Sequence, residues 1–361
     1  MKIAFLSHSH FDGVLKVGSH HLAEQLALLG NDVFHIATPF SWLGSLRSPS
    51  LLKTPRAKTA FLGPAKAAPE RPTNIVPLVA IPARIRAPRT LGRRINRLVD
   101  LNTFDYIFVD QPAFYPVVED VSGPAVVFRP TDMHLNGSLA KADERMMQRA
   151  DGLVATSSVV RDHNLKFRPG LPNMVLENGV DSARFRVPGP HDPRAGFVYV
   201  GAIDYRFDWD AIITIAEHFS RLPIRLVGPV SAPYRGELPG NVQVMGPVKY
   251  SDIPAVLAAA KVGLLPFSKA GINNGRSPMK FYEYLAAGLF IAGTRTDALA
   301  SRSAAGTHLW EESAASVIAA CAIAHDGQAP NEPGMRLADE YDWRSRSRLL
   351  IDFAGRLTAV R

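Results

Sequence analysis

The chain alternates between strand-like and helix-like segments, and this alternation limits its possible folds more than any other feature. Short apolar runs, rich in β-branched and aromatic residues, are separated by longer segments with helical spacing. Such alternation is typical of a parallel sheet covered by helices on both faces. In the first half we expect a helix at 18–30 and strands at 2–8, 32–38, 106–110, 125–130 and 152–157.

A second alternation begins near residue 197. Helices are expected at 208–220 and 251–260, and strands at 197–202, 224–230, 242–248, 262–267 and 290–294. The stretch 177–196, rich in Gly, Pro and charge, is typical of a linker. Because 361 residues exceed what one core usually organises, we predict two domains, 1–180 and 185–341. A last helix, 342–361, is expected to pack back onto the first domain.

The composition excludes several classes of protein. Cys321 is the single cysteine, so an internal disulfide framework and a multi-cysteine zinc site are excluded, and a reducing compartment is expected. The N-terminal MKIAFLSHSHFDG indicates a first strand, not a signal peptide, and no apolar run approaches transmembrane length. Neither GxxxxGK[ST] nor GxGxxG occurs, which argues against an NTPase and a dinucleotide oxidoreductase.

Positive charge is concentrated between residues 41 and 100. This basic segment holds twelve Lys and Arg residues against two acids, so its excess is larger than the net charge of +8 of the whole chain. Nucleic acid or an anionic membrane surface would fit such a segment, and a solvated basic face is the alternative. Its aromatic residues are Trp42 and Phe61, which gives little support to base stacking. The Pro-rich stretch 39–89, which overlaps this segment, is long for a connection and predicts a functional insertion or a partly mobile segment.

The segment NNGRSPMKFYEYLAAG (273–288) predicts a helix that meets an anion. Ser277 is expected to cap the helix, Pro278 to occupy its first position, and Gly288 to adopt the left-handed conformation beyond its end. Lys280 adds a positive charge to a first turn whose backbone N–H groups are already unpaired. Such a helix start suits an anionic ligand.

Three motifs together carry a resemblance to a known family. NGVD (178–181), YVGAIDYRFDWD (199–210) and SPMKFYEYLAAG resemble segments of two-domain glycosyltransferases of the GT-B fold, and the resemblance covers essentially the whole chain. Within that fold, LSHSHFDGVLKVGSHHLAEQLALLG (6–30) and FRPTD (128–132) resemble the membrane-associated glucuronosyltransferases of xanthan-type exopolysaccharide synthesis. The resemblance implies an α/β protein with two Rossmann-like, doubly wound domains that face a cleft.

The resemblance also implies a nucleotide-sugar donor, UDP-linked, as substrate, with no cofactor and no metal. Lys280 and the backbone N–H groups after Ser277 would then hold the diphosphate. Glu283 lies on the same helical face and would accept hydrogen bonds from ribose hydroxyls, while a surface Lys–Glu pair is the alternative. The other donor-site candidates are Gly201, and Met279 and Phe267, which would line the base or sugar pocket or belong to the core.

An inverting transfer requires a base near the acceptor hydroxyl. By the resemblance this base is Asp132, whose alternative role is to cap the following helix. His134 is a second candidate, because imidazole titrates in the range that suits proton transfer. His10 and Asp12 follow the first strand and are candidates for contact with the acceptor.

Departures from the family pattern refine these expectations. Gly275 stands where the widespread retaining branch carries a glutamate, which disfavours retention. Pro247 stands where the glucuronosyltransferases are expected to have an acidic donor contact, so the base and the sugar stay open. Asp208 and Asp210 match the DxD metal-binding motif of the other large transferase fold. Because they begin an expected helix, they are interpreted as capping residues.

The sequence therefore predicts a metal-independent, inverting transferase that moves a sugar, such as glucuronate, from a nucleotide donor to a lipid-diphosphate-linked saccharide. The product would belong to exopolysaccharide or cell-surface polysaccharide synthesis. The basic segment would bring a cytoplasmic protein to the inner face of the plasma membrane. Alternatives are a retaining transferase of the same fold, a nucleotide-sugar epimerase, which would act without an acceptor, and a nucleic-acid-binding protein that uses the basic segment.

Overall fold

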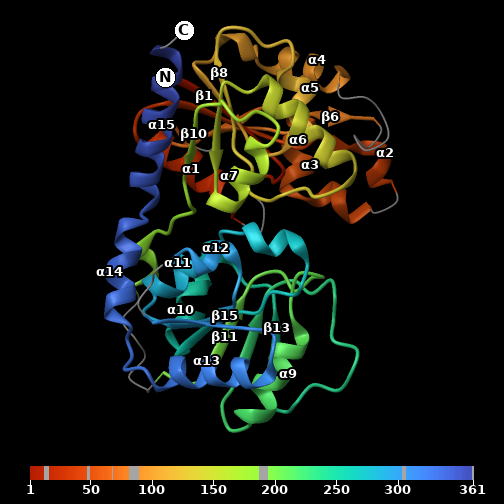
Figure 1. Ribbon diagram of the computed structural model, residues 1–361. Coiled ribbons are helices and arrows are strands. Elements are labelled where there is room, and N and C mark those ends of the chain that lie inside the picture. The colour runs from red at the N-terminus through yellow and green to blue at the C-terminus, as the bar shows by residue number, and fades with distance from the viewer. Residues whose placement is uncertain are drawn as a thin grey trace. The chain divides into compact units, whose positions relative to one another are not determined.

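The computed structural model describes residues 1–11, 16–46, 49–66, 68–80, 89–186, 194–302 and 306–359 (Figure 1). The chain divides into two compact units, one formed by Met1–Glu177 with Trp343–Arg361 and the other by Asn178–Asp342. The last helix, α15 (Trp343–Ala359), belongs to the first unit and packs on α1 (Gly18–Leu28). The rings of His21 and Trp343 stack between these two helices, with centroids 4.8 Å apart.

The first unit is built on an eight-stranded sheet in the order β10-β9-β8-β7-β1-β2-β5-β4. Its neighbouring strands are parallel except for the antiparallel pair β4 and β5. The five strands predicted in this half are all present. The strands are β1 (Lys2–Ser7), β2 (Asp32–Ala37), β4 (Ala65–Lys66), β5 (Thr73–Ile75), β7 (Tyr106–Val109), β8 (Ala125–Phe128), β9 (Gly152–Ala155) and β10 (Asn173–Val175).

Helices cover both faces of this sheet. On one face, α1 packs on β1 and β2, and α15 packs on β8 and β9. On the other, apolar residues of three helices join those of the strands in one buried core, among them Ile95, Val117 and Met146. The helices of this unit also include α4 (Arg89–Leu98), α5 (Tyr115–Val118), α6 (Gly137–Arg149), α7 (Ser158–Leu165), and the short turns η2 (Leu101–Thr103) and η3 (Pro112–Phe114).

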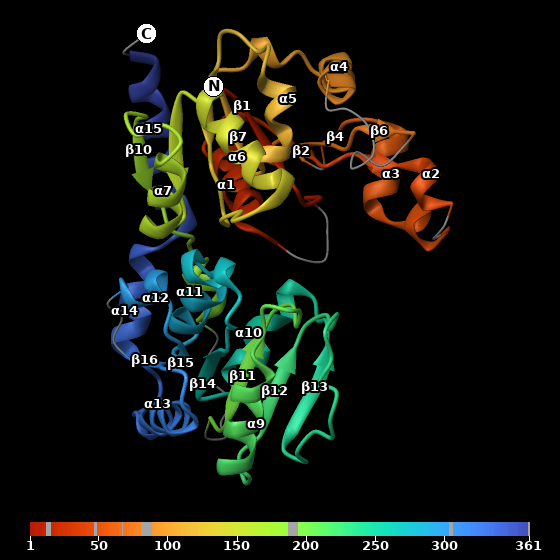
Figure 2. The same ribbon diagram turned by 45° about the vertical axis from the view of Figure 1, so that its right-hand side comes forward.

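The described part of the basic, Pro-rich stretch is a structured insertion. Strand β5 extends the sheet beyond β2, and a separate two-stranded sheet pairs β3 (Phe40–Ser41) with β6 (Leu78–Val79). Three helical segments complete it: α2 (Trp42–Ser45), η1 (Pro49–Lys53) and α3 (Pro55–Leu62). Figure 2 shows α2 and α3 at the margin of the first unit, on the side of the sheet away from α15.

The second unit has a six-stranded parallel sheet in the order β13-β12-β11-β14-β15-β16. This order reverses between β11 and β14, and ligands of doubly wound sheets bind at the carboxyl ends of strands at such a reversal. The strands are β11 (Phe197–Val200), β12 (Ile224–Val227), β13 (Val242–Gly246), β14 (Val262–Leu265), β15 (Phe290–Thr294) and β16 (Thr307–Trp310). All five strands predicted here are therefore present.

The helices of the second unit are α8 (Ser182–Phe185), α9 (Trp209–His218), η4 (Tyr250–Asp252), α10 (Ile253–Ala258), η5 (Gly271–Gly275), α11 (Met279–Ala286), α12 (Asp297–Ala300), α13 (Ala314–Asp326) and α14 (Glu332–Glu340). Helix α8 lies inside the predicted linker 177–196. Asp181 accepts a hydrogen bond from the backbone N–H of Arg184 at the start of α8, and Phe185 is buried in the core. The start of that stretch is therefore folded as part of the second unit.

Candidate functional site

The start of α11 differs from the sequence prediction. The helix begins at Met279, and Pro278 is its N-cap residue, without a side-chain capping bond. Ser277 does not cap the helix but binds Asn178 instead. Its hydroxyl oxygen accepts a hydrogen bond of 3.4 Å from the backbone N–H of Asn178, and its carbonyl oxygen accepts one of 2.6 Å from the side-chain amide of Asn178. Asn178 of the NGVD motif therefore fixes the approach to α11 from a position 99 residues earlier.

The end of α11 is as predicted. Gly288 has a positive φ of 75°, and its N–H donates to the carbonyl of Leu285. The N–H of Leu289 donates to the carbonyl of Tyr284. These two bonds form a Schellman motif, which explains why a glycine stands at this position.

Lys280 and Gly201 are in close contact. Gly201 follows β11, at the reversal of strand order, and a Cβ atom added to it would lie 2.5 Å from Nζ of Lys280. The same Nζ lies 4.8 Å from the ring centroid of Tyr199, which is the last residue but one of β11. A side chain at position 201 would therefore displace the end of the Lys280 side chain, and the positive φ of 155° at Gly201 also favours glycine.

Two arginines add positive charge around Lys280. Arg206 lies in the loop after β11, and Arg276 precedes α11 with its guanidinium 5.8 Å from the Phe267 ring centroid. Burial, and next the charge of Arg276, lower the pKa of Lys280 to about 7, with a smaller contribution of the same sign from Arg206. Glu283 and Asp204 act in the opposite direction, and Arg206 is itself paired with Asp204, so an anion at this place would chiefly stabilise the charges of Lys280 and Arg276.

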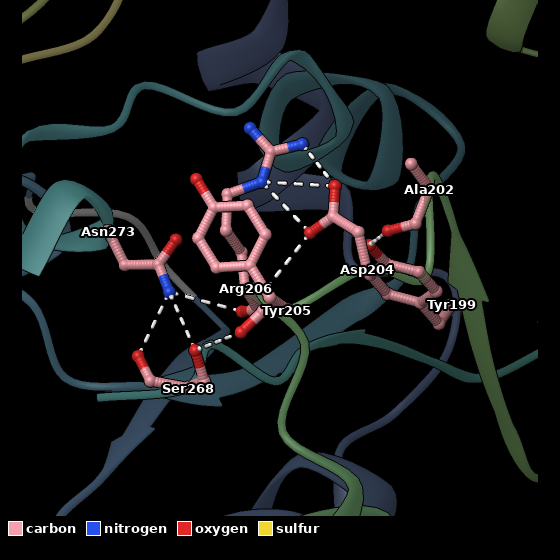
Figure 3. Close-up of polar contacts among 7 residues, drawn as sticks. All are labelled: Tyr199, Ala202, Asp204, Tyr205, Arg206, Ser268 and Asn273. Carbon is pink, nitrogen blue, oxygen red and sulfur yellow. Dashed lines mark hydrogen bonds and ion pairs between the residues drawn. The ribbon is translucent and has the colours of Figure 1, made fainter. Parts of the chain in front are cut away.

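Polar contacts hold the loop that carries Arg206 (Figure 3). The guanidinium of Arg206 pairs with the carboxylate of Asp204. The backbone carbonyl of Arg206 accepts a hydrogen bond of 3.1 Å from the side-chain amide of Asn273. The hydroxyl of Ser268 donates to the carbonyl of Tyr205. The loops after β11 and β14 are thereby joined, so that Arg206 occupies a fixed position.

Glu283 lies one turn after Lys280 on α11 and is almost completely buried. The phenol of Tyr250 donates a hydrogen bond to Oε1 of Glu283 over 3.1 Å. Burial raises the pKa of Glu283 to about 7, while the bond from Tyr250 and the charge of Lys280 oppose this rise. Glu283 is therefore not part of a solvated surface pair, and burial disfavours the charged form of both Lys280 and Glu283.

Of the other donor-site candidates, Phe267 is 3% exposed and belongs to the core, and Met279 is half-buried at the first position of α11. Phe267 also lines a cavity of about 480 Å³, together with Asp208 and Asp210. Asp208 caps α9 by accepting the N–H of Ala211 over 3.1 Å, as predicted. Within the described residues, no group of three or more His, Cys, Asp or Glu side chains is arranged to hold a metal ion.

In the first unit, the candidate base Asp132 follows in sequence a residue of a buried ion pair, Arg129. Arg129, directly after β8, forms two hydrogen bonds of 2.8 and 3.0 Å with the carboxylate of Asp110, and both side chains are 2% exposed. Asp132 follows in the loop and is half-buried. It does not cap the next helix, because the N-cap residue of α6 is Asn136.

His134 follows Asp132 and pairs with a residue that the sequence analysis missed. Its Nδ1 lies 2.9 Å from Oδ2 of Asp143, on the buried face of α6. This hydrogen bond raises the pKa of His134, against burial, and the charge of Asp132 acts in the same direction as that of Asp143. The loop after β8 thus brings together a carboxylate and an imidazole.

Of the two acceptor-site candidates that follow β1, only His10 lies among the described residues. His10 is buried, with 7% of its surface exposed, which leaves little of it for contact with a saccharide. Asp12 lies outside the described residues. Burial lowers the pKa of the neighbouring His20 to about 3, and its Nδ1 accepts the N–H of Val17. His20 is therefore neutral at physiological pH.

Sequence analysis also missed Asn178, Arg206, Arg276 and Tyr250. Arg206 and Arg276 lie inside motifs that it quoted, and they could have been identified as basic residues next to a predicted anion site. Asp143 and Tyr250 carry no local signal, because their partners His134 and Glu283 are brought to them by the fold.

Comparisons with known proteins agree with this architecture. No family model matches the chain. The Bacillus subtilis (strain 168) protein TuaH, which carries the name of a teichuronic acid biosynthesis glycosyltransferase, is 25% identical over 238 residues. That match covers 60% of this chain and 60% of TuaH, so the chain spans less than two thirds of the length of that relative.

Solved structures match over the whole chain. Sucrose-phosphate synthase from Thermosynechococcus elongatus superposes with a TM-score of 0.75 at 14% identity, covering 100% of both chains. Anabaena Alr3699/HepE in complex with UDP has a TM-score of 0.69 at 15% identity, covering 98% of this chain and 100% of that one. The chain therefore has the α/β fold, with parallel sheets, of GT-B glycosyltransferase structures.

Proposed function

We propose that the chain is a glycosyltransferase that binds a nucleotide sugar, UDP-linked, in its second unit. The observation that carries this proposal is the contact of Lys280 with Gly201 at the reversal of strand order, where the charges of Arg276 and Arg206 act on Lys280. A diphosphate is a ligand whose charge suits the two cations Lys280 and Arg276 at the start of a helix. TuaH and the HepE complex with UDP support the same activity and the same nucleotide.

Glu283 is proposed to contact the ribose. Its carboxylate lies on the same helix as Lys280 and is held by Tyr250. The leaving diphosphate would be stabilised by Lys280 and Arg276 without a metal. Inversion is proposed because Gly275, in η5, has no side chain to take the place of the glutamate of the retaining branch. The base would then come from the loop that holds Asp132 and His134.

Calorimetric titration with UDP, UDP-glucose and UDP-glucuronate tests the donor site. We expect binding by the wild type and a loss of affinity of about 10-fold or more in Lys280→Ala, because a charge-assisted contact contributes about 1.5–3 kcal/mol. Lys269→Ala is a matched control, since Lys269 is a largely exposed lysine of the same unit that pairs with Glu312. Equal loss in both variants, or no binding by the wild type, would contradict the proposal.

An anionic membrane surface, which would carry a lipid-linked acceptor, is proposed as a partner of the first unit. Seven large apolar side chains between residues 42 and 62 are more than a third exposed, and we call them the 42–62 face: Trp42, Leu43, Leu46, Leu51, Leu52, Phe61 and Leu62. Lys53 and Lys58 are exposed beside them and line a hollow with Leu52, Phe61 and Leu62. Among the described residues, none of the helices combines the length and apolar character needed to cross a bilayer.

Helix α3 shows why this face is unusual for a protein surface. It turns the small side chains of Ala57 and Ala60 toward a core with Phe40, and it leaves Phe61 and Leu62 outside. Large apolar residues flanked by lysines favour the interface of an anionic bilayer. Arg56 is a different case, because its guanidinium donates to the carbonyls of Thr38 and Pro39.

Sedimentation with vesicles tests this partner. We expect the protein to sediment with vesicles that contain phosphatidylglycerol more than with phosphatidylcholine alone, and the double variant Phe61→Ser/Leu62→Ser to lose this binding. Leu349→Ser removes an exposed leucine from α15 and serves as control. Equal binding to both kinds of vesicle would contradict an anionic partner, and unchanged binding of the double variant would contradict the role of the 42–62 face.

A further inference from the structure

The carboxylate of Glu283 is held at one oxygen only. Its Oε1 accepts a hydrogen bond of 3.1 Å from the Tyr250 phenol, and none of the other described residues donates to this side chain, so that Oε2 has no partner among them. Glu283 is 5% exposed. A nearly buried carboxylate oxygen without a donor is costly, and a ligand that donates a hydrogen bond to it removes this cost.

The start of the second unit holds the ring of Tyr250. The Phe185 ring meets it edge-on, with the two centroids 5.9 Å apart, and the guanidinium of Arg184 lies 5.6 Å from its centroid. Both neighbours belong to α8. The ring of Tyr250 is therefore packed on one helix of this unit, while its hydroxyl reaches Glu283 on another, α11.

The hydrogen bond from Tyr250 favours the ionised form of Glu283. Burial raises the pKa of Glu283 to about 7, and the bond from Tyr250 is the larger of the two effects that oppose this rise. Burial, and next the charge of Glu283, raise the pKa of Tyr250. The proton therefore stays on the phenol at physiological pH, and Tyr250 acts as the donor.

Other groups around this pair come from several elements. Lys280 lies on α11 itself, and its charge favours the ionised carboxylate. Next to α8, the charge of Arg184 lowers the pKa of Tyr250 and that of Asp181 raises it. From β14, β15 and α14, apolar residues join the core around α11. The ionisation of the carboxylate is therefore governed chiefly by its burial, by Tyr250 and by Lys280.

We propose that Tyr250 is a positioning residue of the donor site, which directs Oε2 of Glu283 to the ribose hydroxyls and so makes the site selective for ribonucleotides. The proposal rests on the function proposed above. An ionised carboxylate accepts from Tyr250 at Oε1 and from the ribose at Oε2, whereas a protonated carboxyl turns one oxygen into an O–H donor. Selectivity should therefore be present above the pKa of Glu283 and be lost as the pH falls through it.

The ratio of the affinities for UDP and for 2′,3′-dideoxy-UDP, measured by calorimetry from about pH 6 to about pH 9, tests this role. Both ligands carry the same base and diphosphate, so the effect of Lys280 cancels in the ratio. At about pH 8 the wild type should bind UDP about 10-fold or more tightly than the analogue, which lacks the hydrogen bonds to a charged group. At about pH 6 this preference should be several-fold smaller.

Tyr250→Phe keeps the aromatic ring and removes the donor. The pKa of Glu283 should then rise further, so that the ratio falls several-fold at about pH 7 and recovers at about pH 9. Glu283→Gln should give a low ratio at every pH, because an amide does not titrate. Tyr115→Phe is the matched control, since the Tyr115 hydroxyl also donates to a glutamate, Glu119, but in the first unit.

The outcomes separate this role from simple packing. If Tyr250→Phe loses affinity for both ligands equally and does not recover at high pH, Tyr250 only packs against α8 and the proposal is wrong. A wild-type ratio near one at every pH would refute the ribose contact without any variant, while UDP binding would leave the donor site intact. Absence of UDP binding by the wild type would instead overturn the proposed function.

Discussion

The side-chain amide of Asn178 donates a hydrogen bond to the backbone carbonyl of Ser277 over 2.6 Å. This contact joins the first residue of the second unit to the segment that leads into α11. The N-terminal turn of α11, which carries Lys280, is therefore positioned by a residue far away in the sequence.

We expect Asn178→Ala to weaken UDP binding. The substitution leaves the Ser277 carbonyl without its side-chain donor, at a cost of about 1–3 kcal/mol in local stability. Calorimetric titration should show a several-fold loss of affinity. Asn173→Ala is the control, because the Asn173 amide also donates to a carbonyl, that of Leu171, but in the first unit. An unaltered affinity in Asn178→Ala would mean that the contact does not position α11.

Gly201→Ala should displace Lys280. The new methyl group would lie 2.5 Å from Nζ, and the lysine must move or the loop must shift. We expect a loss of UDP affinity, because Lys280 is displaced, and destabilisation of about 1–3 kcal/mol, because a φ of 155° is strained for alanine. Gly240→Ala has open space around its added methyl group and should change neither quantity. Retention of full affinity in Gly201→Ala would show that the position of Lys280 is not critical.

Removing Arg129 should destabilise the first unit. Arg129→Leu leaves the Asp110 carboxylate buried without its partner, and breaking a buried pair on one side costs about 3–5 kcal/mol. Urea denaturation measures this loss. The surface pair of Arg161 and Asp162 gives the comparison, because Arg161→Ala should cost less than about 1 kcal/mol. Equal losses would contradict the structural role of the buried pair.

Donor affinity should depend on pH through Lys280. Burial and Arg276 lower its pKa to about 7, and a bound diphosphate favours the charged form, so that binding raises the pKa again. Affinity for UDP should therefore fall as the pH rises above 7, with proton uptake on binding. Calorimetry in two buffers of different ionisation enthalpy measures this uptake. In Lys280→Arg the uptake should decrease, because arginine stays charged and only Glu283 still has a pKa near 7.

Most of the strands follow directly from the sequence, because a buried parallel strand is a short apolar run wherever it occurs. Lys280 and Glu283 were predicted from a local motif, and the structure places both on α11. Ser277 shows the limit of such reasoning. A Ser-Pro pair is a good helix start by itself, but here Asn178 binds the Ser277 hydroxyl and carbonyl, and the helix begins after Pro278.

The parts that sequence reasoning missed are contacts between distant segments. Asp143 of α6 pairs with His134 of the preceding loop across nine positions, and no spacing rule joins the two residues. Tyr250 reaches Glu283 from a position 33 residues earlier. The pKa values of such groups depend on burial, which a sequence does not show at the level of single atoms.

The assignment of α15 to the first unit has a consequence for synthesis on the ribosome. Phe353 and Leu357 of α15 lie against Gly152 of β9, where an added methyl group would meet both side chains. The residues of the second unit, Asn178–Asp342, are contiguous and leave the ribosome before α15 does. The second unit can therefore begin to fold before α15 emerges, while the apolar face around β9 stays uncovered until α15 has emerged.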